Sequence, residues 1–196
     1  MVCEGLTEIG VCRSINKHRI KDGNASSKGV RFANGGGTNQ IEYAKGFLNA
    51  GYNVCLFCDS DVEKTNNEKD ELIKCGIIIV DSNKGNSIEK QLFEDLPWAG
   101  INELISYRIK KKEETSVVNS VKSKYKGEFP SEWKSSDNKE MRTALYEASV
   151  VKKNEWFKTI ESGEFIGNVC GKYLDQMDGK KMKQQLDELS KWIDNV

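Results

Sequence analysis

The chain has 196 residues and a mass of 22.1 kDa, which is enough for one domain with a real core and too little for two large ones. Its 30 basic and 30 acidic side chains cancel to a formal net charge of zero, so any contact with nucleic acid must come from local patches. Hydrophobic residues make up 37% of the chain and the mean hydropathy is −0.62, a polar composition that is still unlike that of a disordered chain.

The first half of the chain alternates short apolar runs with helical patterns. We predict strands at residues 2–3, 28–34, 52–58 and 76–80, separated by helices at residues 7–19, 38–50 and 63–74. Thr38 is the expected N-cap of the second helix, and the fourth strand has the continuous apolar character of a fully buried one. Strands alternating with helices predict right-handed parallel crossovers and an α/β sheet covered on both faces.

The second half contains only helical patterns. They cover residues 87–96, 100–112, 116–124, 139–153, 164–177 and 179–193, and residues 127–137 are the expected linker. We therefore predict an α/β core over residues 1–98 and a helical region over residues 99–196 that completes the domain. The basic runs near residues 108–112 and 122–126 are typical of solvated helix faces, with phosphate contacts along a DNA duplex as the alternative.

Neither a membrane-spanning segment nor a secretory signal is expected. No apolar run approaches the roughly 20 residues that span a bilayer, and the first residues lack the basic and apolar regions of a signal peptide. We expect a cytoplasmic protein with six free thiols. Cys55 and Cys58 have the spacing of a redox or zinc pair, but residues three apart in a strand point to opposite faces. His18, the only histidine, is interpreted as a surface residue.

Acidic and polar residues stand where the predicted strands end. The set comprises Glu4 and Glu8 after the first strand, Asp59 and Asp61 after the third, and Ser87 and Glu89 after the fourth. Because the carboxyl ends of parallel strands meet at one edge of a sheet, we expect these side chains to lie close together. Residues i and i+2 of an extended chain share a face, so Asp59 and Asp61 are expected to point the same way.

Carboxylates gathered at one edge repel one another unless a cation neutralises them. Oxygen-only ligands suit Mg²⁺ or Mn²⁺, so the set predicts a site for divalent cations. The alternative is that each acidic side chain is separately solvated in its loop.

These motifs resemble the TOPRIM domain, the metal-binding module shared by topoisomerases, primases and several nucleases. The resemblance rests on the run from Cys3 to Glu8 and on the apolar strand that leads into Asp59 and Asp61. Within that group the chain is most similar to the OLD (overcoming lysogenisation defect) family of ATPase-coupled nucleases, through residues 4–8, 59–61, 86–89, 92–97 and 156–158. The resemblance extends from residue 4 to about residue 160, which is nearly the whole chain except the last helices.

The resemblance implies a Rossmann-like TOPRIM fold with a four-stranded parallel sheet and a DNA endonuclease that uses two Mg²⁺ or Mn²⁺ ions. By the resemblance, the metal ligands are Glu4, Glu8, Asp59, Asp61 and Glu89, and the catalytic residues are Glu4, Ser87 and Lys158. The two aspartates would hold one ion, and the glutamates would hold or orient the second ion and the attacking water. Lys158 would stabilise transition-state charge, although a lysine after two aromatic residues is also typical of a helix surface.

The chain departs from OLD nucleases in one respect. It has no Gly-x-x-x-x-Gly-Lys-Ser/Thr motif, and the glycine turn at residues 35–38 lacks the lysine that reaches nucleotide phosphates. We therefore expect DNA and a separate ATPase domain or subunit as partners, a homodimer as a further option, and no membrane. The short stretch before Glu4 favours either a fragment or a subunit that works beside an ATPase. A role in defence against phage is implied by the resemblance and is not indicated by the residues themselves.

Two other functions stay open. Asp59 after an apolar strand also matches the nucleophile of a haloacid dehalogenase-type phosphatase, although the later Gly-Asp motif is missing and the aspartate is not on the first strand. The main alternative is a non-catalytic TOPRIM-like assembly or DNA-binding module that works with a separate ATPase, whose mark would be DNA binding without cleavage.

Overall fold

The computed structural model describes residues 1–19 and 25–196, apart from the side chains of residues 16–19, 64 and 65. The side chain of His18 lies outside the described residues, so its interpretation as a surface residue stays a prediction.

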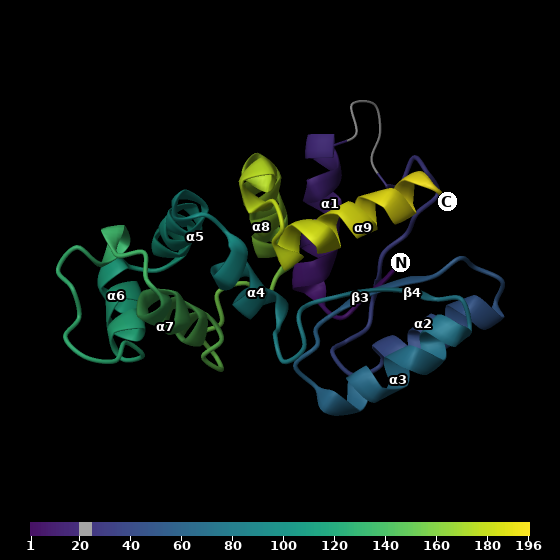
Figure 1. Cartoon of the computed structure of the whole chain (residues 1–196), viewed down its shortest axis with the longest axis horizontal. Helices are drawn as coiled ribbons and strands as arrows, with labels where there is room; N and C mark the ends of the chain where they lie inside the picture. Colours follow the sequence, from purple (N-terminus) through teal and green to yellow (C-terminus); the bar gives the residue numbers. More distant parts are fainter. Residues whose placement is uncertain (20–24) are drawn as a thin grey trace.

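A four-stranded, fully parallel sheet forms the centre of the first half (Figure 1). Its strands are β1 (Val2–Cys3), β2 (Ala33–Asn34), β3 (Cys55–Cys58) and β4 (Ile78–Asp81), in the order β2-β1-β3-β4. Val2 pairs with Ala33 on one side and with Leu56 on the other. This arrangement confirms the predicted α/β class with a parallel sheet.

The strands are shorter than their apolar runs. The predicted strand at residues 28–34 pairs only over its last two residues, because residues 25–29 form a turn closed by a hydrogen bond from the backbone of Val30 to Ala25. The expectation of a fully buried fourth strand is wrong, because β4 lies at the edge of the sheet and Ile78 is 49% exposed.

Alternation along β3 separates its two cysteines. Cys55 and Phe57 belong to the large core cluster, whereas Leu56 and Cys58 belong to a smaller cluster on the opposite face. The two thiols therefore point away from each other, as predicted. All six cysteines are thiols and form no disulfide, as expected.

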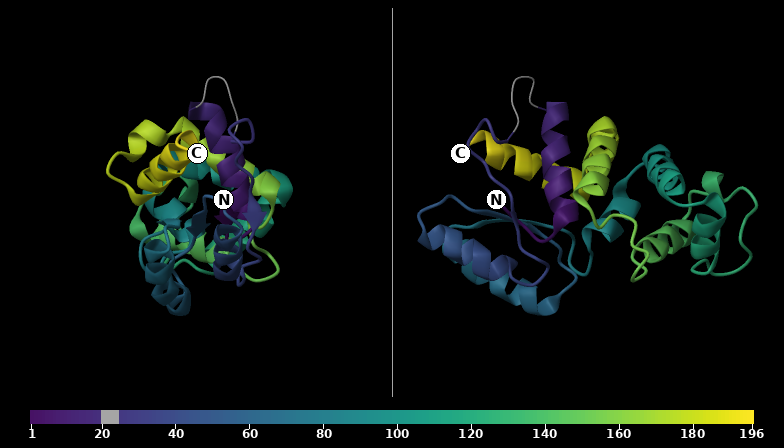
Figure 2. Two further views of the ribbon diagram at one scale, coloured as in Figure 1. Left: turned by 90° about the vertical axis from the view of Figure 1, so that its right-hand side faces the viewer. Right: turned by 180° about the vertical axis from the view of Figure 1, so that it is seen from behind.

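Helices cover both faces of the sheet (Figures 1 and 2). α1 (Leu6–Arg19) and α9 (Lys181–Asp194) pack on one face, and α2 (Gln40–Asn49) and α3 (Glu63–Lys74) pack on the other. The prediction of Thr38 as the N-cap of α2 is wrong: the glycine turn continues, with Gly36 and Gly37 at positive φ, and Asn39 takes the cap position without a side-chain hydrogen bond.

The second half is helical, as predicted. It contains α4 (Ile88–Asp95), α5 (Trp98–Lys111), α6 (Glu114–Lys122), α7 (Lys139–Ser149), α8 (Ile160–Lys172) and the short 3₁₀ turns Trp133–Ser135 and Leu174–Met177. The expected linker contributes the buried Trp133 to the core, although most of its other residues are exposed. No helix in the described part of the chain is both long and apolar enough to cross a bilayer.

Close packing of α1 against α8 joins the two ends of the chain (Figure 2). A Cβ atom at Gly163 would lie 2.2 Å from the carbonyl oxygen of Thr7, and one at Gly10 would lie 2.3 Å from the carbonyl oxygen of Ile160. Only glycine permits this approach. The Thr7 hydroxyl also donates to the carbonyl of Phe157, which fixes the segment before α8 beside the start of α1.

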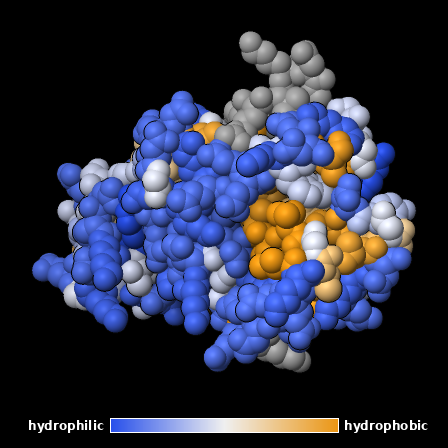
Figure 3. Space-filling view, turned by 45° about the vertical axis from the view of Figure 1, so that its right-hand side comes forward, coloured by the Kyte–Doolittle hydropathy of each residue, from blue (hydrophilic) through white to orange (hydrophobic). Residues whose placement is uncertain are grey.

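The amino-terminal edge of the sheet is apolar. A cavity of about 490 Å³ opens there, lined by residues that include Met1, Val30, Phe47, Val54 and Trp192. Figure 3 shows an apolar area on this side of the molecule. The carboxyl edge differs sharply, because polar and charged side chains gather there.

Candidate metal centre

Four carboxylates from distant parts of the chain meet at the carboxyl edge of the sheet. Glu4 follows β1, Glu8 lies in the first turn of α1, Asp59 follows β3 and Glu89 lies in the first turn of α4. Each of the other three raises the pKa of Asp59 through its charge, which places all three within electrostatic reach of Asp59.

Backbone donors orient three of these carboxylates. Glu4 Oε2 accepts from the backbone N–H of Asp59 at 2.9 Å, and Glu8 Oε2 accepts from that of Gly5 at 2.8 Å. Asp59 Oδ1 in turn accepts from the N–H of Ile88 at 2.7 Å. These bonds link β1, β3 and the start of α4, so the cluster is fixed by three elements that meet only in the folded protein.

Burial and mutual repulsion favour protonation within the cluster. Burial is the main cause that raises the pKa of Glu8 to about 7, and the charges of Glu89 and Glu4 add to it. Burial also raises the pKa of Asp59 to about 9, together with the charges of Glu8, Glu4 and Glu89. A divalent cation among them would relieve this repulsion and favour the ionised forms.

Lys158 lies at the mouth of the cluster. Its Nζ is 2.9 Å from Glu89 Oε1, and the Lys158 side chain is 59% exposed whereas that of Glu89 is 3% exposed. Burial alone would lower the pKa of Lys158, but the charges of Glu89, Glu8 and Asp59 raise it above the usual value. The packing of α1 on α8 is what brings this late residue to the sheet edge.

Ser87 and Tyr146 form a polar pair beside the cluster. Ser87 is the N-cap of α4 and accepts from the backbone N–H of Lys90 at 3.3 Å. Tyr146 of α7 lies close enough to Ser87 to affect its ionisation, and its pKa is raised first by burial and then by Glu89, Asp61 and Asp59. Nothing in the sequence around Tyr146 indicated this position, because α7 joins the site only through its packing on α4.

Asp61 stands apart from the other predicted ligands. The chain bends at Ser60, whose N–H donates to Asn86 and whose carbonyl accepts from Gly85, so the strand geometry does not continue past Asp59. Asp59 is half-buried within the cluster, whereas Asp61 is exposed on the side of Tyr146. Because alternation holds only in extended backbone, it does not fix the relative direction of the two aspartates, and their shared direction stays a prediction.

The carboxylate oxygens of the cluster suit a hard cation, but the side chains are not arranged as a preformed coordination site. Glu4, Glu8 and Asp59 each use one oxygen for a backbone donor and supply only oxygen ligands. In residues 1–19 and 25–196, excepting the undescribed side chains, no group of three or more His, Cys, Asp and Glu residues has an arrangement that could hold a metal ion. The side chains must therefore rearrange toward a common centre before they can share one cation.

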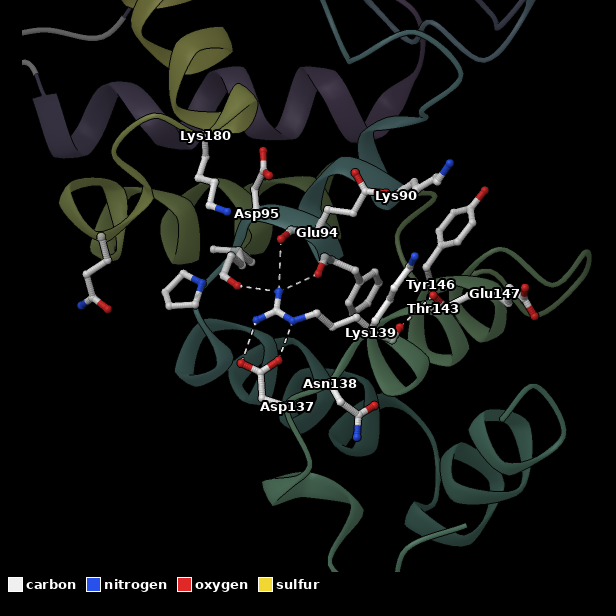
Figure 4. Close-up of a pocket in the computed structure, with 15 residues that line it drawn as sticks. Lys90, Glu94, Asp95, Asp137, Asn138, Lys139, Thr143, Tyr146, Glu147 and Lys180 are labelled. Carbon is white, nitrogen blue, oxygen red and sulfur yellow. Dashed lines mark hydrogen bonds and ion pairs between the residues drawn. The ribbon is translucent and has the colours of Figure 1, made fainter. Parts of the chain in front are cut away.

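A groove of about 890 Å³ lies beside the cluster, between α4 and α7 (Figure 4). Its lining includes Lys90, Lys139 and Tyr146. Arg142 also lines the groove, forms a bidentate ion pair with Asp137 at 2.6 and 3.0 Å, and donates to backbone carbonyls at the end of α4. Arg142 is thus fully engaged in joining α4 to α7.

Comparisons with known proteins give no match: no family model fits the chain, and no curated protein or solved structure is significantly similar to it. The resemblance to TOPRIM and OLD proteins therefore stays an interpretation of the motifs.

Proposed function

We propose that this chain is a Mg²⁺- or Mn²⁺-dependent DNA endonuclease of the TOPRIM type, working as part of an OLD-like nuclease. The observation that carries the proposal is the group of buried, mutually repelling carboxylates at the carboxyl edge of a parallel sheet. A protein that keeps such charges together gains most when cations are bound there.

Glu4, Glu8 and Asp59 are the residues that would hold the cations. Their hydrogen bonds to backbone N–H groups fix one oxygen of each side chain and leave the other oxygen for a ligand role. Two divalent cations at such a site supply an activated water molecule and counter-charge for the leaving oxygen of a phosphodiester. Asp61, which is exposed, would complete the ligand set from the solvent side of the group.

Lys158 and the Ser87–Tyr146 pair are the residues that would contact the scissile phosphate. The Lys158 ammonium is exposed and held by Glu89, which suits a point charge placed against a non-bridging oxygen. The hydroxyls of Ser87 and Tyr146 supply neutral donors beside it. The adjoining groove, with Lys90 and Lys139, offers a path for the DNA backbone, and the ATPase would act from a separate domain or subunit.

The proposal is tested by incubating the full chain with supercoiled plasmid and Mn²⁺ or Mg²⁺, with EDTA as the metal-free control. Wild-type protein should nick or linearise the plasmid, and Asp59→Asn should reduce the rate by about 100-fold or more. Asp175→Asn, which changes an exposed aspartate in a 3₁₀ turn, should leave the rate unchanged. Cleavage that survives both EDTA and Asp59→Asn would refute the proposal.

The second candidate is a non-catalytic assembly or DNA-binding module that works with an ATPase. It is favoured by the lack of a ready metal cage among the described side chains and by the raised pKa values of Glu8 and Asp59, which suit a site that stays protonated. In that case the chain should bind DNA or a second copy without cutting DNA, even with Mn²⁺ supplied, and it should bind no Mn²⁺ in calorimetry.

A further inference from the structure

A second charged network lies next to the carboxylate cluster, across β3 and β4. Lys69 of α3 is only 6% exposed, and its ammonium donates to the carbonyl of Asp59 at 2.8 Å, to Ser60 Oγ at 2.9 Å and to Asp81 Oδ2 at 2.9 Å. The three N–H donors of a lysine ammonium are thereby all used. Ser60 Oγ also donates to Asp81 Oδ2 at 2.9 Å, which closes the network.

Burying the Lys69 ammonium at this position is energetically unfavourable. Removing an ammonium from water carries a large desolvation penalty, and replacing a buried ion pair with apolar side chains is often neutral or stabilising. The network therefore needs a reason other than net stability. Its contacts suggest one, because two of the three acceptors belong to the turn that carries Asp59.

This turn is fixed from α3 at successive points. Lys69 bonds to Asp59 and Ser60, and the side-chain amide of Asn66 donates to the Ser60 carbonyl at 2.9 Å. On the other side of the same turn, the Asp59 carboxylate accepts from the N–H of Ile88. Without the bonds from α3, the repulsion within the cluster would act on a turn held mainly by its contacts to the loop before α4.

We propose that Lys69 is a positioning residue for the metal site: it holds the turn after β3 so that Asp59 stays among the other carboxylates, and Asp81 keeps Lys69 in place. The inference rests on the proposed function for its role in metal binding. The structural part, that Lys69 governs the order of the Asp59 turn, stands on the contacts alone.

Mn²⁺ affinity of the full chain, measured by calorimetry, is the first test. Lys69→Met keeps most of the length of the side chain and removes its charge, and it should weaken Mn²⁺ binding about tenfold, as loss of an orienting contact typically does. Lys74→Met, at the exposed end of the same helix, should leave the affinity unchanged. An affinity of Lys69→Met equal to that of the wild type would overturn the inference.

A double variant separates positioning from stability. Lys69→Met leaves Asp81 without its closest cation, whereas Lys69→Met/Asp81→Asn removes both charges and should recover much of any lost thermal stability. If Lys69 positions Asp59, the double variant should still bind Mn²⁺ about tenfold more weakly than the wild type. Recovery of wild-type affinity in the double variant would show a purely structural role.

Amide hydrogen exchange provides a readout that needs no metal. Lys69→Met should speed exchange at the amides of Asp59 and Ile88, which take part in the bonds of the turn, more than at the amides of α8. If wild-type protein binds no Mn²⁺, the proposed function fails and this comparison alone decides the inference. Equal protection at Asp59 and Ile88 in wild type and variant would contradict it.

Discussion

The two charged networks at the carboxyl edge of the sheet differ in how their charges are balanced. At the end of β4, Asp81 is paired with the buried Lys69, so the chain supplies its own counter-charge. At the ends of β1 and β3, Glu4, Glu8 and Asp59 have backbone donors, and the nearby Lys158 pairs with Glu89. Buried acidic side chains therefore do not by themselves indicate a metal site. The informative feature is a buried group of acids whose charge the chain leaves uncompensated.

The largest effect is expected at the packing of α8 on α1, which positions the preceding segment with Lys158 beside the cluster. Gly163→Val should force α8 away from α1, because its side chain would meet the Thr7 backbone, and should lower the free energy of unfolding by about 3 kcal/mol or more. Gly46→Ala, at a helical position with nothing within 4 Å of the added Cβ, should be neutral or slightly stabilising. Denaturant unfolding of both variants measures the difference; equal midpoints would show that the α1–α8 contact is looser than described.

Removing one negative charge from the carboxylate cluster should weaken metal binding. Glu8→Gln keeps an oxygen for the Gly5 N–H but removes the negative charge, so it should weaken Mn²⁺ binding and slow plasmid cleavage by about 10- to 100-fold. The exposed Glu113→Gln serves as the control and should change neither quantity. Calorimetry and the plasmid assay measure the two effects, and unchanged Mn²⁺ affinity in Glu8→Gln would remove Glu8 from the proposed ligands.

The same network should make the metal-free protein less stable as pH rises. The folded-state pKa values of Glu8 and Asp59, about 7 and about 9, lie above their ordinary values of 4.5 and 3.8. The stability linked to the protonated forms is therefore fully present below about pH 4 and is lost as pH rises through 7 and then 9. In EDTA, the melting temperature should fall over this range.

Asp59→Asn should flatten that decline, because the amide cannot ionise. At pH 8.5 the metal-free variant should melt several degrees above the wild type, at about 2–4 °C per kcal/mol for a chain of this length. Asp175→Asn should follow the wild-type curve. Parallel pH profiles for wild type and Asp59→Asn would mean that Asp59 is solvated and not part of a repelling group.

The smallest effect is expected at Tyr146. Tyr146→Phe removes one neutral hydroxyl beside Ser87, so cleavage should slow by about 2- to 10-fold while Mn²⁺ affinity stays at the wild-type value. Tyr43→Phe, on the exposed surface of α2, is the matched control. A parallel loss of Mn²⁺ affinity in Tyr146→Phe would instead place Tyr146 in the metal site.

The alternating pattern of the first half was sufficient to predict the parallel sheet and its helical layers. It also brought Glu4 and Asp59 to the same edge, because residues that directly follow parallel strands must meet there. Local patterns were less informative where the chain leaves regular structure. Asp61 lies beyond a bend at Ser60, so strand alternation does not fix its direction relative to Asp59, and β4 is exposed because of its place at the edge of the sheet.

Lys69 and Tyr146 could not be assigned from the sequence. Each lies on a helix whose pattern shows only that it is amphipathic, and a lysine or tyrosine there is normally read as a surface residue. Their positions depend on how α3 packs on β4 and how α7 packs on α4, which are contacts between distant segments.

Sequence alone thus determined the class of fold and which acids end the strands, because both follow from short-range periodicity. Tertiary structure alone decided which of those acids share a low-dielectric environment, which one is paired with a buried lysine and how close Lys158 lies. These properties depend on burial and on through-space charge, and both arise only when segments far apart along the chain pack together.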